Sequence, residues 1–403
     1  MHHLPPFAVE EWMDTYETQA KYQLAETCCA SISIEELASL SEAPGAKASD
    51  ILDLSSIQGY GEVTGLKALR ENLSRLYSSK AGSPLPADDI LITPGAIAAN
   101  TIVALAMVKA GDHVICHYPT YQQLYDVPRS IGCKVDLWKA KEDRQWQPDF
   151  DELEAMVTDE TKLIILNNPQ NPTGAVVGKT LLAKVVELAE SKGIAILSDE
   201  VYRPLFHGIS PIDREFPPSI VSMGYKNVIV TGSLSKAYSL AGLRVGWIAS
   251  RNPDFIAACA SVRQYTTISV SQLDQSVAAF ALSNDTIHSL LGRNIQMAKT
   301  NLELLERFII KHDEFCSWVK PVAGTTAFIN FSRDGAPVDA EALCKAVMEK
   351  TGVMILPGDK GFGEEYKGYV RIGYVNTTDI VQQGLEELRK FMRKDFDDVP
   401  LSR

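Results

Sequence analysis

Short apolar runs alternate with helix-like stretches through the first two thirds of the chain. The runs that read as strands are residues 89–93, 112–116, 134–138, 163–166, 194–197 and 228–230. Helical patterns lie between most of them, such as the apolar stretch 96–109. This alternation is typical of a mostly parallel sheet covered by helices on both faces. The sequence therefore predicts an α/β fold whose ligand site lies beyond the carboxyl ends of the strands.

The segment before this region predicts an N-terminal arm. Residues 7–42 read as mostly helical, with Trp12, Tyr16 and Leu24 among charged positions, and Ser33 and Glu36 form a capping-box pattern. A short strand is expected at residues 51–54. The arm, residues 1–49, is expected to pack on a later domain, and the large domain is expected to span residues 50–284.

The last third of the chain predicts a smaller α+β domain over residues 285–403. Helical patterns at 285–311, 339–350 and 378–392 are interrupted by strand-like runs at 325–331 and around Arg371. The polar tail from Asp395 to Arg403 is expected to fray.

Composition excludes several classes of protein. A net charge of −12 argues against a nucleic-acid-binding surface, which needs a concentrated basic face. The seven cysteines include no CxxC pair, so neither a disulfide framework nor a metal site is expected. The first residues lack the pattern of a signal peptide, and no apolar run approaches transmembrane length. We therefore expect no membrane partner and a cytoplasmic location.

Lys236 stands just after the apolar run 228–230, at a predicted strand end. Ser233 and Ser235 precede it and Arg244 follows, so the loop offers a nucleophilic amine together with groups that suit a phosphate. Desolvation and nearby cations are expected to lower the pKa of this lysine, which favours a Schiff base with an aldehyde cofactor. Taken alone, Lys236 also fits an ordinary exposed loop lysine.

Other strand ends carry polar or aromatic groups that suit the same ligand. Tyr121 can stack on a flat ring or serve as a core residue, and Asn171 offers an amide held between two prolines. A buried carboxylate at Asp199 requires a cationic partner, such as a protonated pyridinium nitrogen. The backbone amides of residues 95–97, at a helix start, can bind phosphate.

These segments together resemble a known enzyme family. Four motifs carry the resemblance: NNPQNPTG at 167–174, DEVY at 199–202, SLSK at 233–236 and GLRVGW at 242–247. In this order and spacing they resemble the fold-type-I, pyridoxal-phosphate-dependent aminotransferases of classes I and II, from about residue 50 onward. The resemblance implies an enzyme that uses pyridoxal 5'-phosphate.

The resemblance also implies the parts of the cofactor site. Lys236 would bind the cofactor as a Schiff base and act as general acid and base, and Asp199 would pair with the ring nitrogen. Asn171 and Tyr202 would bind the ring oxygen, and Tyr121 would stack on the ring. The phosphate would be held by Ser233, Ser235, Arg244 and the backbone of Gly95, Ala96 and Ile97.

Substrate and partner follow from the same resemblance. Arg371 would bind the α-carboxylate of an amino acid, with Asn171 beside it. Tyr60 matches a tyrosine that reaches the phosphate of a neighbouring subunit, which implies a homodimer with shared active sites. Arg263 is a weaker candidate for contact with a distal substrate carboxylate.

Two reactions remain open from the sequence. The first is transfer of an amino group from an L-amino acid to a 2-oxo acid. The arm, however, lacks the glycine-proline segment of ordinary aminotransferases and looks more like that of capreomycidine synthase and its relatives. A pyridoxal-phosphate-dependent elimination, replacement or cyclisation in specialised metabolism is therefore the alternative.

Overall fold

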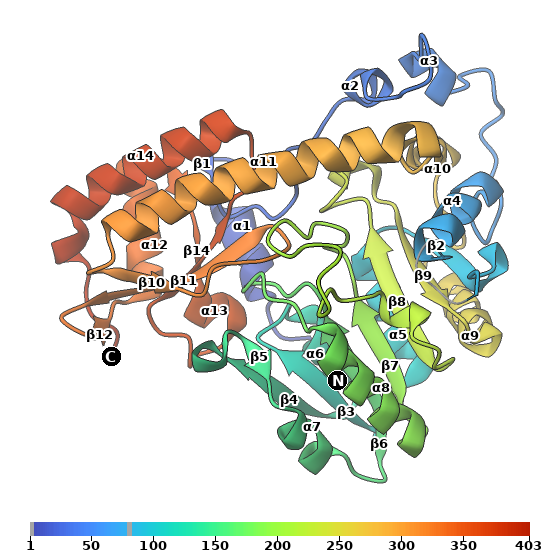
Figure 1. Ribbon diagram of the computed structural model, residues 1–403, viewed down its shortest axis with the longest axis horizontal. Coiled ribbons are helices and arrows are strands. Elements are labelled where there is room, and N and C mark those ends of the chain that lie inside the picture. The colour runs from blue at the N-terminus through green and yellow to red at the C-terminus, as the bar shows by residue number, and fades with distance from the viewer. Residues whose placement is uncertain (1–3, 79–82) are drawn as a thin grey trace.

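The computed structural model describes residues 4–78 and 83–403. The chain forms a larger part built on an eight-stranded sheet and a smaller part built on a second sheet (Figure 1). The larger sheet has the order β2 (Ile90–Thr93), β9 (Gly246–Ser250), β8 (Val228–Ser233), β7 (Ala195–Asp199), β6 (Thr161–Asn167), β3 (His113–Tyr118), β4 (Lys134–Lys141) and β5 (Gln147–Pro148). Neighbouring strands from β8 to β4 pair in parallel, whereas β9 and β5 are antiparallel to their neighbours. The predicted mostly parallel α/β sheet is confirmed.

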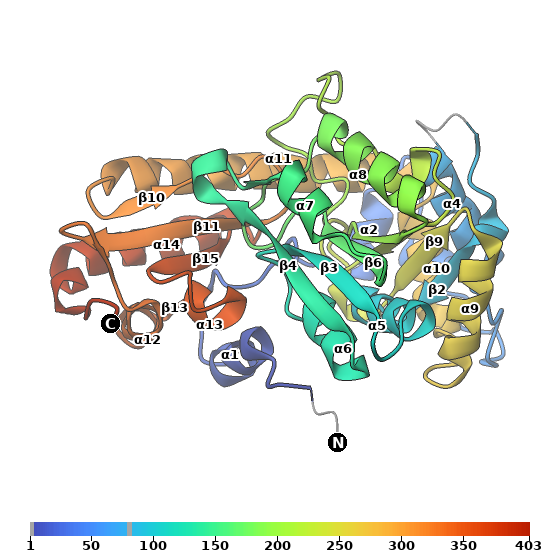
Figure 2. The ribbon, with the colours of Figure 1, turned by 90° about the horizontal axis from the view of Figure 1, so that it is seen from below.

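Helices cover both faces of this sheet (Figure 2). On one face lie α5 (Ala96–Met107), α6 (Gln123–Ile131) and α9 (Pro253–Gln264); on the other lie α7 (Phe150–Met156) and α8 (Lys179–Lys192). Because both faces are covered, the central strands are buried throughout, as their continuous Val, Ile and Leu runs indicate. The helix α8 ends at Gly193, whose φ of 67° is a left-handed conformation that glycine adopts without strain.

The smaller sheet is antiparallel. Its order is β10 (Cys316–Trp318), β11 (Thr326–Arg333), β15 (Tyr369–Gly373) and β14 (Leu356–Pro357), and β12 (Ala336–Pro337) pairs with β11. The helices nearby are α12 (Ala340–Thr351), α13 (Gly358–Phe362) and α14 (Thr378–Lys394). Arg371 lies on β15, between β11 and β14, and is not on an edge strand. The long helix α11 (Asn284–Lys311) extends along both parts of the molecule (Figure 1).

The N-terminal arm contacts both parts. Helix α1 (Ala8–Tyr16) packs near α13, and β1 (Tyr22–Gln23) pairs in parallel with β13 (Val353–Met354) of the small region. The capping box at Ser33 begins α2 (Ile34–Ser39), as predicted. The mostly helical prediction is wrong between these elements, because residues 20–32 run extended and give their backbone N–H groups to the small region and to the Lys236 loop.

Two other local predictions are wrong. Residues 51–54 do not form a strand, since α3 (Ala48–Ile51) ends there in turns that lead to α4 (Lys67–Ser78). The C-terminal tail does not fray, because Phe396 is buried and Leu401 forms a bridge to Val338.

Helix α10 (Gln272–Ala281) precedes α11. The division into domains at residues 49/50 and 284/285 stays a prediction.

Candidate active site

A cavity of about 420 Å³ lies at the carboxyl ends of β6, β7 and β8. It brings together eleven residues that the sequence singled out: Ala96, Ile97, Tyr121, Asn171, Asp199, Tyr202, Ser233, Ser235, Lys236, Arg244 and Arg371. Parallel strands place their carboxyl ends at one edge, and the register sets Asn167 beside Asp199 and Asp199 beside Thr231. The strand ends thus supply the floor of the site, while Arg371 approaches from the small sheet.

One end of the cavity has the groups that a phosphate requires. Ser233 Oγ and Ser235 Oγ are 2.8 Å apart, and Arg244 donates to Ser235 Oγ at 3.4 Å. Gly95 has a φ of 85° and precedes α5, so a side chain there would be strained, and its Cβ would lie 3.0 Å from Arg244 Nη2. A bare backbone, two hydroxyls, a guanidinium and a helix start form a cradle that fits a phosphate.

Gly246 keeps this cradle close to the sheet. A Cβ at this glycine would lie 2.4 Å from the carbonyl carbon of Gly95 and 2.7 Å from the Ala96 nitrogen. Backbone atoms cannot yield as a flexible side chain does, so only glycine lets the strand β9 approach the start of α5.

Asp199 lies buried at the end of β7 and is held in one orientation. Asn100 Nδ2 donates to its Oδ2 at 2.9 Å, and the Val201 N–H donates to Oδ1 at 3.0 Å. Thr231 in turn donates to Asn100 Oδ1 at 2.7 Å, which fixes the orientation of the Asn100 amide. Burial raises the pKa of Asp199, although these hydrogen bonds oppose that effect. A buried carboxylate of this kind fits a cationic ring nitrogen.

Lys236 contacts the extended arm. Its Nζ lies 2.6 Å from Thr27 Oγ1, 3.3 Å from Cys28 Sγ and 3.5 Å from Glu26 Oε1. Burial alone would lower the pKa of Lys236, but the Cys28 thiol and the Glu26 carboxylate more than offset it and hold the pKa above its ordinary value. The prediction of a lowered pKa is therefore wrong, because the groups that contact Lys236 Nζ include acidic ones and not the expected cations.

Arg371 is buried and only partly satisfied. It donates to Asn171 Oδ1 at 3.4 Å and to the Ala25 carbonyl at 2.7 Å. Its Nε has no hydrogen-bond partner in the described part of the chain, and no described carboxylate lies within ion-pair distance of its guanidinium. The arginine is thus held in place while retaining its capacity to bind an anion.

Three candidates lie outside the cavity lining. One is Gly95, which immediately precedes the lining residues Ala96 and Ile97, and the other two are Tyr60 and Arg263. Tyr60 is 74% exposed and does not line the cavity of its own chain. Arg263 is 1% exposed on α9 and donates to the carbonyls of Ile92 and Val63. These bonds tie a loop to β2, and the structure does not support contact between Arg263 and a substrate in the same chain.

Sequence reasoning missed the contribution of the arm. Val9, Glu10, Met13, Glu26, Thr27 and Cys28 all line the cavity. The only signal was the absence of a glycine-proline segment, which indicates a difference but does not say which residues replace it. Asn100 was missed as well, because one asparagine in an apolar helix gives no indication of its distant partner Asp199.

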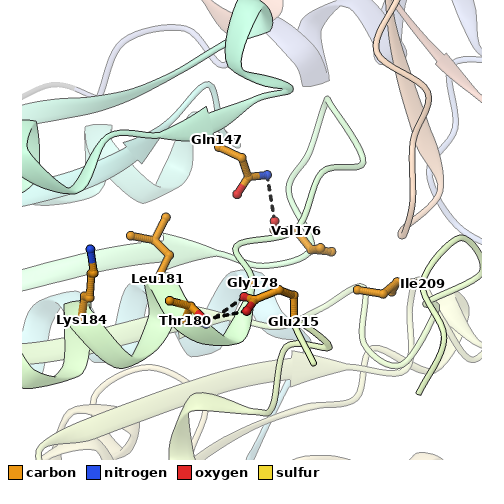
Figure 3. Close-up of a pocket in the computed structure, with 8 residues that line it drawn as sticks. All are labelled: Gln147, Val176, Gly178, Thr180, Leu181, Lys184, Ile209 and Glu215. Atoms are coloured by element: carbon orange, nitrogen blue, oxygen red, sulfur yellow. Dashed lines mark hydrogen bonds between the residues drawn. The ribbon is translucent and has the colours of Figure 1, made fainter. Parts of the chain in front are cut away.

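A second pocket lies between β5 and the start of α8 (Figure 3). Its lining consists of Gln147, Val176, Gly178, Thr180, Leu181, Lys184, Ile209 and Glu215. Glu215 accepts hydrogen bonds from the backbone and hydroxyl of Thr180, at 3.0 and 2.5 Å, so its carboxylate is used locally. None of the predicted site residues lines this pocket, and the cavity around Lys236 is the candidate active site.

Comparison with known proteins agrees with this geometry. Residues 36–388 match the family described as Aminotransferase class I and II. The structure of a PLP-dependent aminotransferase from Streptococcus suis 89-1591 is similar, with a TM-score of 0.87 and 37% identity over 97% of this chain and 98% of that chain.

More distant relatives include two enzymes with different reactions. A (5-formylfuran-3-yl)methyl phosphate transaminase from Methanocaldococcus jannaschii is 29% identical over 83% of this chain and 84% of its own. Capreomycidine synthase from Streptomyces vinaceus is 27% identical over 95% of this chain and 92% of its own. The family match covers most of the sequence, and the chain belongs to the class I and II aminotransferases, enzymes that depend on pyridoxal phosphate.

Proposed function

We propose that this protein transfers the amino group of an L-amino acid to a 2-oxo acid. The observation that carries the proposal is the meeting of Lys236, Asp199 and Arg371 in one cavity. An amine for the cofactor aldehyde, a carboxylate for the ring nitrogen and a guanidinium for the substrate carboxylate are what this reaction requires. Bound pyridoxal phosphate supplies a pyridinium ring that accepts the electron pair released at the substrate Cα.

The side chains around Lys236 prepare it to move a proton. With pyridoxal phosphate and a substrate bound, the Nζ of Lys236 would take the proton from the substrate Cα and return it as general acid and base. Thr27 Oγ1, at 2.6 Å, is positioned to hold that amine. Tyr202 is buried beside it. Tyr121 lines the cavity from the loop before α6, and its hydroxyl donates to Glu10 at 2.6 Å.

Arg371 orients the substrate. Its guanidinium binds the α-carboxylate in a fork of two N–H groups, and Asn171 and the Ala25 carbonyl keep that fork in position. With the carboxylate fixed, the Cα–H bond can be directed toward Lys236. Because Arg371 belongs to the small sheet, approach of the two parts of the molecule would exclude water from the reacting atoms.

A spectral titration tests this function. The purified protein loaded with pyridoxal phosphate is mixed with a panel of L-amino acids, and we expect the absorption of the aldehyde form to convert to that of the amine form. A 2-oxo acid added afterwards should reverse the change and leave a new amino acid. If no L-amino acid produces the amine form, the proposal is wrong.

A second candidate is an elimination or cyclisation on the same cofactor. It is favoured by the arm at Lys236, where Glu26, Thr27 and Cys28 line the cavity, and by the similarity to capreomycidine synthase over 95% of the chain. The same titration separates the two reactions. An unsaturated or cyclic amino-acid product, with the cofactor recovered as the aldehyde, would favour elimination, whereas a 2-oxo acid product would favour transamination.

We further propose that the protein acts as a homodimer with shared active sites. Exposed apolar side chains gather on the loop before α4 and on a second segment, which runs into the start of α10. Gln272 of this segment donates to the Gly59 carbonyl of the loop. The exposed side chains are Leu54, Ile57, Tyr60, Val63, Tyr265, Ile268 and Leu273. A patch of this kind marks an interaction surface.

The free thiols of all seven cysteines support a reducing compartment such as the cytoplasm.

Sedimentation velocity tests the dimer. We expect a mass of about twice the 44.2 kDa of one chain, and partial dissociation when Ile57, which is 93% exposed, is changed to serine. Ile212→Ser is the matched control, because Ile212 is equally exposed on another loop. A monomeric wild-type protein would contradict the proposal.

A further inference from the structure

Two carboxylates in the active-site cavity have no function in the proposed transamination. Glu10 comes from the first turn of α1, and Glu26 comes from the extended arm that follows β1. Both line the same cavity as Arg371, and both contribute to the electrostatic environment of its guanidinium. The question is which group these carboxylates bind.

A balance of charges shows that Glu10 and Glu26 lack a cationic partner once cofactor and substrate are bound. The cavity has three cationic side chains, Lys236, Arg244 and Arg371, and three carboxylates, Asp199, Glu10 and Glu26. In the proposed function, the phosphate takes Arg244 and the substrate carboxylate takes Arg371. Asp199 takes the ring nitrogen, and Lys236 must be a neutral amine when it accepts the Cα proton. Glu26, which is half-buried, and Glu10, which is exposed, are then left without a cationic partner. For the more buried Glu26 this is unfavourable unless a cation joins it.

The geometry of Glu26 suits a cationic ligand. Its Oε1 accepts the backbone N–H groups of Thr27 at 2.5 Å and Cys28 at 2.9 Å, so the carboxylate is held in one orientation. Lys236 Nζ, at 3.5 Å, already places an ammonium beside it. Although burial raises the pKa of Glu26, Lys236 and the hydrogen bonds lower it to about 2, so this side chain is charged at neutral pH.

The wall beside Glu10 suits the aliphatic part of a long side chain. Val9 and Met13, on the same helix, are buried apolar residues that line the cavity. A lysine- or arginine-like side chain buries its methylene groups on apolar surface and keeps its charged end at polar groups. Apolar and acidic groups on one helix therefore match the two parts of such a side chain.

From these observations we propose that the amino donor is an L-amino acid with a guanidinium or ammonium side chain, which Glu26 and Glu10 bind while Arg371 binds the α-carboxylate. Arg371 independently indicates an anionic ligand, such as a carboxylate, because it is 3% exposed and its Nε has no partner in the described residues. The inference rests on the proposed function and adds the substrate class. Dicarboxylic donors are disfavoured, since Glu10 and Glu26 repel a second carboxylate.

The test measures binding without turnover. Isothermal titration calorimetry of the loaded enzyme compares 5-guanidinopentanoate with 5-ureidopentanoate, two carboxylates of similar shape that lack an α-amino group and differ in charge. We expect the guanidino compound to bind about tenfold to a hundredfold more tightly, the usual range for hydrogen bonds to a charged group. The Glu26→Gln variant should remove most of this preference, because glutamine can still accept the backbone N–H groups but carries no charge.

Further variants make the test specific. Glu10→Gln should reduce the preference by a smaller factor, because Glu10 is exposed at the mouth of the cavity. Glu11→Gln removes an exposed charge from the same helix and should leave the preference unchanged. Equal binding of the two compounds, or a preference that survives in Glu26→Gln, would overturn the inference.

The titration with amino acids keeps the two proposals distinguishable. If L-arginine, L-lysine or L-ornithine produces the amine form at much lower concentration than L-citrulline, L-norleucine and L-glutamate, both proposals stand. Conversion by neutral or acidic amino acids alone leaves the transaminase proposal in place and refutes the substrate class. If no amino acid converts the cofactor while the guanidino compound still binds selectively, the reaction is wrong and the substrate class stands.

Discussion

Replacing Lys236 with alanine is expected to abolish covalent attachment of the cofactor and to lower turnover by about 10⁴-fold or more, since nucleophile and proton carrier are lost together. Lys236 is the one lysine that lines the described cavity, so no other amine there can take its place. Reduction with borohydride followed by mass spectrometry measures the attachment. The wild-type chain should retain the cofactor on Lys236, and the variant should retain none.

A surface lysine provides the control for this experiment. Lys226 is exposed in the loop before β8, and Lys226→Ala should behave as the wild type in both attachment and turnover. Because Lys236 forms an ion pair with Glu26 in the structure, its loss also leaves that carboxylate without its cation. We therefore expect a modest change in stability beside the loss of activity. Covalent cofactor on the Lys236→Ala chain would contradict the assignment.

The site residues that could be predicted from the sequence are those that lie just beyond the ends of strands. Asn171, Asp199 and Lys236 each come shortly after an apolar run, and parallel strands bring such positions to one edge of the sheet. Each of these residues also belongs to a short motif, and these motifs carry the resemblance to the aminotransferase family. The sheet was predictable for the same reason, because continuous apolar runs separated by amphipathic helices have few other ways to bury their surface.

The arm could not be predicted in this way, because its conformation depends on distant partners. Residues 20–32 run extended because their backbone N–H groups find acceptors at Gly352, Met354, Val375 and the Lys236 loop. No local pattern in the arm indicates these acceptors. The rise in the pKa of Lys236 was missed for the same reason, since Glu26 and Cys28 reach the lysine only after the chain folds.

Changing Asp199 to asparagine is expected to lower kcat/KM by about a hundredfold to a thousandfold, comparable to removing one charged or hydrogen-bonding group aimed at a transition state. The amide keeps the shape of the side chain, and its one oxygen can still accept either the bond from Asn100 or the bond from Val201, so the fold should persist. What is lost is the charge that keeps the ring nitrogen protonated. Steady-state kinetics with the best amino donor measures the effect.

Two comparisons assign this loss to the charge of Asp199. Glu200→Gln makes the same change in the adjacent residue, whose buried carboxylate pairs with Arg203 at 3.3 Å and does not line the cavity. It should lower stability with little effect on kcat/KM, because an unpaired Arg203 is left behind while the cofactor site is intact.

A cofactor analogue methylated at the ring nitrogen carries a permanent positive charge and should restore part of the activity of Asp199→Asn. If the analogue does not help, Asp199 acts by holding the ring in position and not by keeping its nitrogen charged.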